Sequence, residues 1–149
     1  MTRAILSAAL AIVFMAGVSA QDKPNFAGKW KPAGSFNTYT ITVEGNTMTV
    51  THTVAGNSES TEYLLDGTPS KKTMEGPNGV IEHVRVSTWE GNVLVTATQV
   101  GTGFANTERR WLEPDGTMRV QTILTMVQGK PAPPPPPGVG AGMVLKKIG

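Results

Sequence analysis

His52 is the side chain of this sequence with the clearest capacity for acid–base or polar ligand chemistry. In residues 47–54, threonines alternate with Met48, Val50, His52 and Val54, as in a strand with two different faces. The apolar members share a face with the imidazole, so we expect His52 to point inward. There it could orient a bound ligand or act as a general base. The alternative is a histidine at the end of a strand that hydrogen-bonds a neighbouring group.

The other candidates for catalysis or metal binding form no constellation. In residues 80–89, His83 and Arg85 alternate with Val84 and Val86, and the valine face is expected to be the interior. His83 and Arg85 are therefore predicted to lie outside. Two histidines on separate strands without a third ligand predict no metal site, and the lack of cysteine excludes thiol chemistry. The sequence contains neither a nucleophile elbow nor a phosphate-binding glycine loop, so we expect a non-enzymatic protein without cofactors.

The segments that carry these residues have the pattern of short strands. Residues 38–54 form a strong hairpin pattern, in which Tyr39 and Ile41 alternate with threonine before a Gly-Asn turn. Two further hairpins are expected over residues 80–100 and 107–127, and no helix is expected after the first 20 residues. About eight to ten antiparallel strands in succession predict an all-β, up-and-down β-barrel.

The first 20 residues are predicted to be a signal peptide. Arg3 gives a positive start, residues 4–17 are uncharged and mostly apolar, and small side chains precede a cleavage site before Gln21. An uncleaved N-terminal anchor is the alternative. No later segment reaches the about 20 apolar residues of a membrane-spanning helix. We therefore expect an exported protein, periplasmic or extracellular, in which residues 21–149 form one domain.

The distribution of charge argues against a nucleic-acid partner. The chain has 13 Lys and Arg residues against 11 Asp and Glu residues, a net charge of +2, and these residues are scattered along it. A nucleic-acid-binding surface normally concentrates its basic residues on one face. We expect a monomer without a nucleic-acid partner.

Residues 129–142 form a segment rich in proline and glycine before a last apolar stretch. The run from Pro133 to Pro137 lacks backbone donors and favours polyproline II or irregular structure. Two interpretations remain open: a long loop leading to a closing strand at residues 143–148, or a disordered linker. We favour the loop, because disordered tails seldom end in apolar residues. The proline run could also bind an aromatic-lined groove on an envelope protein, or serve as a passive spacer.

A short aromatic segment, FAGKWK at residues 26–31, follows the signal peptide. Phe26 and Trp30 share a face of an extended chain, and Gly28 leaves space between the two rings. The segment resembles the Gly-x-Trp first strand of the calycins, which include the lipocalins and the fatty-acid-binding proteins. With an Arg-Trp pair at residues 110–111 before an Asp-Gly turn, the chain is similar to small exported lipocalin-like bacterial proteins.

This resemblance implies a calycin-type barrel in which Trp30 closes one end, often against an arginine of a late strand. Arg109 and Arg110 are the candidates for that cation–π contact. The helix pair of the fatty-acid-binding proteins does not fit between residues 32 and 37, and the proline-rich insertion is not part of the calycin pattern. The class of ligand therefore does not transfer from the resemblance.

Together these features predict that the barrel binds a small, partly apolar ligand in its interior. The expected lining residues are Tyr39, Ile41, Met48, Val50 and His52. One alternative is an envelope interaction module with a filled core, which contacts a partner through its rim or its proline-rich loop. A third possibility is a small-barrel enzyme that uses His52 as a base.

Overall fold

A computed structural model describes residues 22–137 and 140–149, so the predicted signal peptide lies outside the described residues. The described residues form an all-β structure, in which we find no helix that is long and apolar enough to cross a membrane. The strands are β1 (Gly28–Pro32), β2 (Thr38–Glu44), β3 (Thr47–Val54), β4 (Asn57–Leu64), β5 (Ser70–Gly76), β6 (Gly79–Glu90), β7 (Val93–Val100), β8 (Phe104–Leu112), β9 (Met118–Val127), β10 (Lys130–Pro131) and β11 (Met143–Lys147).

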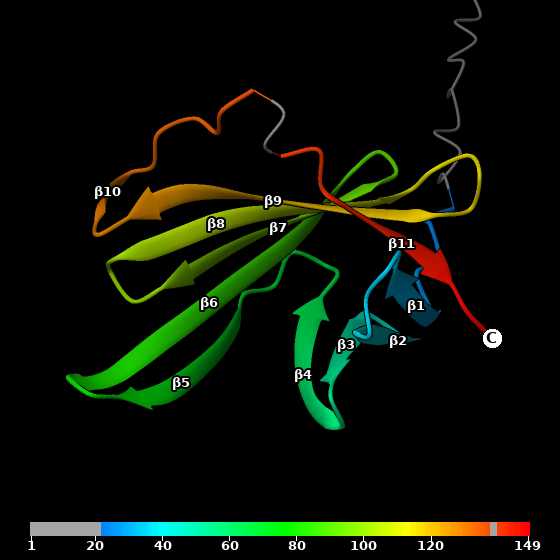
Figure 1. Cartoon of the computed structure of the whole chain (residues 1–149). Helices are drawn as coiled ribbons and strands as arrows, with labels where there is room; N and C mark the ends of the chain where they lie inside the picture. The colour runs from blue at the N-terminus through cyan, green and yellow to red at the C-terminus, as the bar shows by residue number, and fades with distance from the viewer. Residues whose placement is uncertain (1–21, 138–139) are drawn as a thin grey trace, which may run out of the picture.

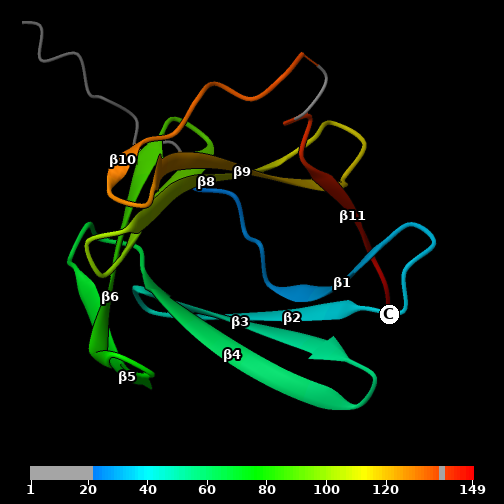
Figure 2. The ribbon, with the colours of Figure 1, turned by 60° about the vertical axis from the view of Figure 1, so that its left-hand side comes forward.

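The strands form one antiparallel sheet that curls into a nearly closed barrel (Figures 1 and 2). Its order is β4-β3-β2-β1-β11-β9-β8-β7-β6-β5, and the two-residue β10 pairs with β9 beside this path. Nearly all neighbours in the sheet are also neighbours in sequence, as in an up-and-down barrel. β4 and β5 are the two ends of the sheet, and no strand pairing joins them in the described structure. The predicted fold class is confirmed.

The hairpin of β2 and β3 shows why the alternating pattern folds this way. Residues directly opposite each other include Tyr39 with His52 and Ile41 with Val50, so the apolar and aromatic side chains of both strands share the inner face. Gly45 closes the turn with a φ of 57°, in the left-handed region that glycine adopts at least cost. Ile41 and Val50 are buried in the core, and the threonines occupy the opposite face.

The aromatic segment at the start of the chain anchors one end of the barrel. Trp30 and Phe26 are both buried, and the Trp30 indole Nε1 donates a hydrogen bond of 2.8 Å to the Phe26 carbonyl oxygen. Phe26 precedes β1 and stacks on Trp89 of β6, with 5.9 Å between the ring centroids. The cation over the Trp30 ring is Lys147 of β11, at 5.5 Å. The neighbouring strand β11 thus supplies this cation, in the place where we expected Arg109 or Arg110.

Gly28 makes room for that lysine. Its φ is 138°, a conformation that side chains disfavour, and a Cβ atom there would lie 2.6 Å from Cε of Lys147. From the sequence we expected Gly28 to leave space between two aromatic rings. In the structure the group that approaches Gly28 is the side chain of Lys147 on β11. The glycine of the Gly-x-Trp segment therefore serves the contact between the first and last barrel strands.

The prediction that His83 and Arg85 lie outside was wrong. Both residues share a face of β6 with Ser87, and Ser87 is buried and hydrogen-bonded to Thr96 of β7 at 2.8 Å. The inner face of β6 is therefore polar, and His83 and Arg85 border a cavity between β4 and the β5–β6 hairpin. Charged side chains are tolerated on this inner face because the unpaired end of the sheet keeps it open to water.

The proline-rich segment is an arch between β10 and β11, which both pair with β9 (Figure 1). Met143 lies opposite Val120 and Leu145 lies opposite Met118, so the tail is a closing strand. The loop interpretation expects such a closing strand, and residues 138 and 139 of the predicted loop lie outside the described residues. One end of the arch is tied by the Ala132 amide, which donates to the Thr125 carbonyl oxygen at 3.0 Å.

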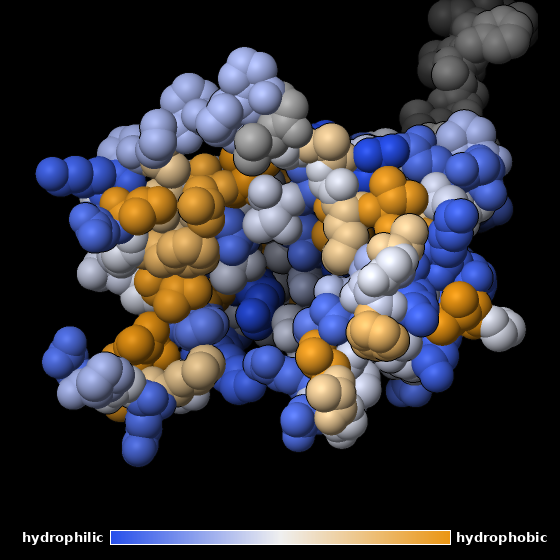
Figure 3. All heavy atoms as spheres, in the orientation of Figure 1, coloured by the Kyte–Doolittle hydropathy of each residue, from blue (hydrophilic) through white to orange (hydrophobic). Residues whose placement is uncertain are grey.

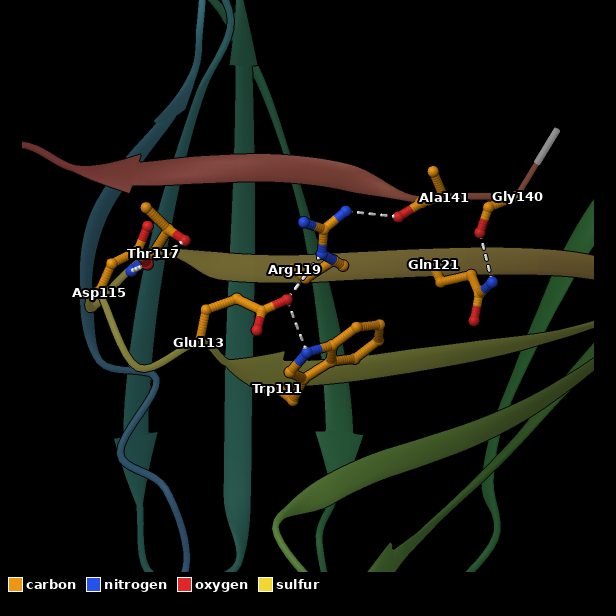
Figure 4. Close-up of polar contacts among 8 residues, drawn as sticks. All are labelled: Trp111, Glu113, Asp115, Thr117, Arg119, Gln121, Gly140 and Ala141. Carbon is orange, nitrogen blue, oxygen red and sulfur yellow. Dashed lines mark hydrogen bonds and ion pairs between the residues drawn. The ribbon is translucent and has the colours of Figure 1, made fainter. Parts of the chain in front are cut away.

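Side chains of β9 hold the other end of the arch (Figure 4). Arg119 donates to the carbonyl oxygen of Ala141 at 2.8 Å, and Gln121 donates to that of Gly140. Glu113 accepts a second hydrogen bond from Arg119, also at 2.8 Å. The five prolines between these attachments are all exposed. The arch is thus fixed at both ends and presents its prolines to solvent.

Candidate ligand cavity

A cavity of about 270 Å³ lies inside the barrel, and the space-filling view is hollowed near its centre (Figure 3). At the volume that one molecule occupies in liquid water, it has room for about nine waters. Strands from both halves of the sheet contribute to its wall. The lining residues are Tyr39, Val50, His52, Glu59, Thr61, Tyr63, Glu108, Arg110, Val120, Thr122, Met143 and Leu145.

Tyr39 and His52 form a stacked pair on one wall. They lie directly opposite each other on β2 and β3, and their rings are nearly parallel with 4.5 Å between centroids. The Nε2 atom of His52 is buried and has no hydrogen-bond partner in the described structure. Glu59 of β4 lies opposite His52 in the strand register. The stack fixes the plane of the imidazole, and Nε2 is shielded from solvent.

Arg110 and Glu108 form an ion pair on the facing wall. They are two residues apart on β8 and so share its inner face. Nη2 of Arg110 lies 2.8 Å from Oε1 of Glu108, and the two side chains are 5% and 20% exposed. The guanidinium also lies over the Tyr63 ring at 5.7 Å, and its Nη1 is 4.0 Å from Sδ of Met118. Nε of Arg110 is buried without a partner in the described structure.

The two tyrosines of the cavity remain protonated at neutral pH. Burial raises the pKa of Tyr63 to about 12, and the nearby Glu108 carboxylate adds to the increase, whereas Arg110 and Arg85 oppose it. Burial also raises the pKa of Tyr39, with Arg110 opposing the shift. Both phenols can therefore act as hydrogen-bond donors to a bound molecule.

Three of the five predicted lining residues, Tyr39, Val50 and His52, border the cavity. The other two, Ile41 and Met48, lie in the packed core with 1% and 0% of their surface exposed. Of the two predicted closure arginines, Arg110 borders the cavity, whereas Arg109 pairs outside with Glu90 at 2.9 Å.

The sequence reasoning missed Tyr63 and Glu108 as lining residues. The signal for Glu108 was its spacing of two from Arg110 within a predicted strand, which places both side chains on one face.

The cavity adjoins the gap between the two ends of the sheet. Glu59 and Thr61 of β4 line it and also line a second cavity of about 420 Å³, which Lys72 of β5 and Arg85 of β6 border from the other side. β4 is not paired with β5 or β6 in the described structure, so the wall of the barrel is interrupted on this side.

The described residues include no group of three His, Asp or Glu side chains that could hold a metal ion. Comparison of the chain with protein-family models and with curated protein sequences finds no match.

Proposed function

We propose that this chain is an exported, non-enzymatic barrel protein of the calycin type that binds a small, partly apolar ligand in its interior. The observation that carries the proposal is the interior cavity of about 270 Å³, whose wall combines polar side chains such as His52 and Arg110 with apolar ones.

The remaining lining supports a ligand with an apolar part. Val50, Val120, Met143 and Leu145 contribute apolar surface beside the polar groups. Such a mixture, in which a few polar groups orient a molecule held by apolar contact, is typical of small-molecule sites. The cavity volume of about 270 Å³ lies just below the range for such sites, about 300–1,000 Å³, and so indicates a small ligand.

A role for His52 as a catalytic base receives less support from its contacts. A general base is usually oriented by a second polar group, as a carboxylate orients the histidine of a triad. His52 is held by stacking on Tyr39, and its buried Nε2 has no partner in the described structure. We therefore assign His52 to ligand orientation.

The test is native mass spectrometry of the protein purified gently from its own host. We expect a bound small molecule that disappears in Val120→Trp, which fills the cavity, and is weakened in His52→Ala. Val43→Trp, at a position that is 37% exposed, is the matched control and should retain it. A wild-type protein that carries no ligand and takes up none from a panel of small apolar molecules would contradict the proposal.

The proline arch supports a second candidate function, an interaction module of the cell envelope. Its five prolines are exposed and its two ends are tied to β9, which suits recognition by an aromatic-lined groove. A photo-crosslinker placed at Ala132 should capture one defined envelope protein in the host. Replacing Pro133 to Pro136 with alternating glycine and serine should abolish that product, and an unchanged product would contradict this role.

A further inference from the structure

The gap in the barrel lies between two strands that follow each other in sequence. From β1 to β9 in the described structure, each strand pairs with the next one except at this place, between β4 and β5. The two strands are joined by residues 65–69 and stand apart in Figure 1. A connection of this length is ordinary for a hairpin of two paired antiparallel strands. The connectivity therefore does not force the gap to stay open.

The two walls of the gap carry opposite charge. Both border the cavity of about 420 Å³, whose charged lining residues are Glu59 and Glu62 on β4 and Lys71, Lys72 and Arg85 on the β5–β6 hairpin. Within the described part of the chain, no ion pair joins the two walls, and Lys71 instead pairs with Glu82 of its own hairpin at 3.9 Å. Opposite charges that face each other across water attract, so the walls favour a closer approach.

The faces of the two strands limit how they could pair. On β4, the buried Tyr63 lines the interior cavity. On β5, Ser70 lies opposite Arg85, which shares the inner face of β6 with Ser87. Residues that are opposite each other in an antiparallel pair lie on the same face, so Tyr63 can lie opposite Ser70. A shift of one residue would turn every inner side chain of β5 outward.

Pairing with Tyr63 opposite Ser70 uses the whole length of β5. Its seven residues would lie opposite seven of the eight residues of β4. Glu62 would then lie opposite Lys71 on the outer face, and Glu59 would lie diagonal to Lys72 on the inner face. Opposite charges in such positions stabilise strand pairing. A shift of two residues in either direction leaves fewer pairs and moves Lys71 away from the position opposite Glu62.

We infer that the barrel has a second, closed state in which β4 and β5 pair in this register and shut the gap. Pairing would give partners to the free backbone groups of both strand edges. It would also remove Glu59, Lys72 and Arg85 from bulk water, which costs free energy. Because these two effects oppose each other, the open state described here and the closed state can exchange.

The closed state would act as a gate for the interior cavity. Glu59 and Thr61 line both the interior cavity and the cavity in the gap. A bound molecule would lose more of its contact with water in the closed state than in the open one, and this difference would shift the equilibrium toward closure. The gate rests on the proposed function, whereas the closed state itself does not.

Introduced cysteines report closure directly, because the natural chain contains none. In Ser60→Cys/Thr73→Cys, the two thiols are opposite each other on the outer face in the inferred register. In Ser58→Cys/Thr73→Cys, the thiols are offset by two residues, at about 7–8 Å, where a disulfide needs backbone movement to form. In a glutathione redox buffer, the opposite pair should therefore form its disulfide at least about tenfold faster than the offset pair.

A charge reversal tests whether attraction between the walls favours closure. Adding Glu62→Lys to the opposite pair places two lysines against each other in the closed state, and disulfide formation should become at least about twofold slower. Glu44→Lys, at an exposed position of β2, makes the same change away from the gap and should leave the rate unchanged. An equal rate with and without Glu62→Lys would contradict the inferred register.

The outcomes separate the closed state from the proposed function. If the opposite pair forms no disulfide, or forms it no faster than the offset pair, the closed state is overturned. Cooperative urea unfolding of the reduced variants shows that they are folded; should Ser60→Cys/Thr73→Cys fail this criterion, Glu62→Cys/Lys71→Cys tests the same register.

Release of a bound molecule tests the gate. If the protein purified from its host carries a small molecule, the oxidised opposite pair should release it at least about tenfold more slowly than the reduced form. Equal release from both forms would overturn the gate. If the protein carries no molecule and takes up none, the proposed function fails, while the disulfide rates still decide whether the gap closes.

Discussion

The buried hydroxyl pair of Ser87 and Thr96 gives a sharp test of how the barrel interior is stabilised. The two side chains are each 1% exposed, and their oxygen atoms lie 2.8 Å apart on neighbouring strands. Removing one hydroxyl leaves the other buried without its partner, which costs about 1–3 kcal/mol. Removing both hydroxyls leaves no orphaned group, so the double variant should lose only about 0–1 kcal/mol.

The measurement is the free energy of unfolding in urea for Ser87→Ala, Thr96→Val and the double variant. With a denaturant slope of about 2 kcal/mol per molar, a loss of about 2 kcal/mol moves the midpoint by about 1 M. Each single variant should therefore unfold at clearly lower urea than the double variant. The coupling free energy, which is the sum of the two single losses minus the loss of the double variant, should be about 1–6 kcal/mol.

The chain provides a matched control in Thr51 and Ser60, whose oxygen atoms are also 2.8 Å apart on neighbouring strands but exposed. There water can replace the lost partner, so Ser60→Ala should change stability by less than about 0.5 kcal/mol. If the double variant at Ser87 and Thr96 lost as much stability as the two single variants together, the reasoning about the buried pair would be refuted. The same conclusion would follow if buried and exposed pairs gave equal costs.

Three further predictions concern the first strand, the cavity and the arch. Gly28→Ala should lose about 1–3 kcal/mol of unfolding free energy in urea, because the backbone φ of 138° at this position is strained for any side chain. If the additional change Lys147→Ala restored full stability, the loss would come from the clash with Lys147 and not from the backbone. The pKa of Tyr63 is about 12 in the folded protein, against 10.0 for a free tyrosine. The stability that its protonated form contributes is therefore fully present below pH 10 and decreases by about 3 kcal/mol as pH rises toward 12. Urea unfolding between pH 9 and 12 should show this decrease, and Tyr63→Phe should remove most of it; an equal decrease in that variant would assign the effect to another group. Arg119→Met should speed amide hydrogen exchange around Ala141 through loss of its 2.8 Å hydrogen bond, and exchange at the wild-type rate would show that Arg119 does not hold the arch.

Much of the fold could be predicted because it is encoded locally. The hairpins expected over residues 38–54, 80–100 and 107–127 correspond to β2–β3, β6–β7 and β8–β9, since each has a pattern of short strands that meet at a turn. The prediction of which face of β6 points inward was wrong. The sequence favours the face of Val84 and Val86, whereas the buried Ser87 shows that the other face points inward. Which face is covered depends on the neighbouring strands and not on β6 alone.

The candidate site was less predictable, because it is assembled from distant strands. His52 could be assigned to the interior from its own strand, and Tyr39 from the strand opposite. The contact of Arg110 with Tyr63 depends on closure of the barrel, and no local pattern brings β4 and β8 together. The choice between Arg109 and Arg110 likewise required the strand register, because adjacent residues point to opposite faces.

Pairing of β1 with β11 has a consequence for how the protein folds. Trp30 lies opposite Lys147, so the barrel joins residues more than one hundred positions apart in the chain. β11 is also the last strand in sequence. During synthesis the hairpins can form early, but β1 and β9 remain without this neighbour until residues 143–147 have emerged. Unpaired strand edges of this kind are templates for association with other chains. The growing chain therefore passes through an aggregation-prone open sheet, and folding should be slow for a protein of this size because its closing contacts are so distant in sequence.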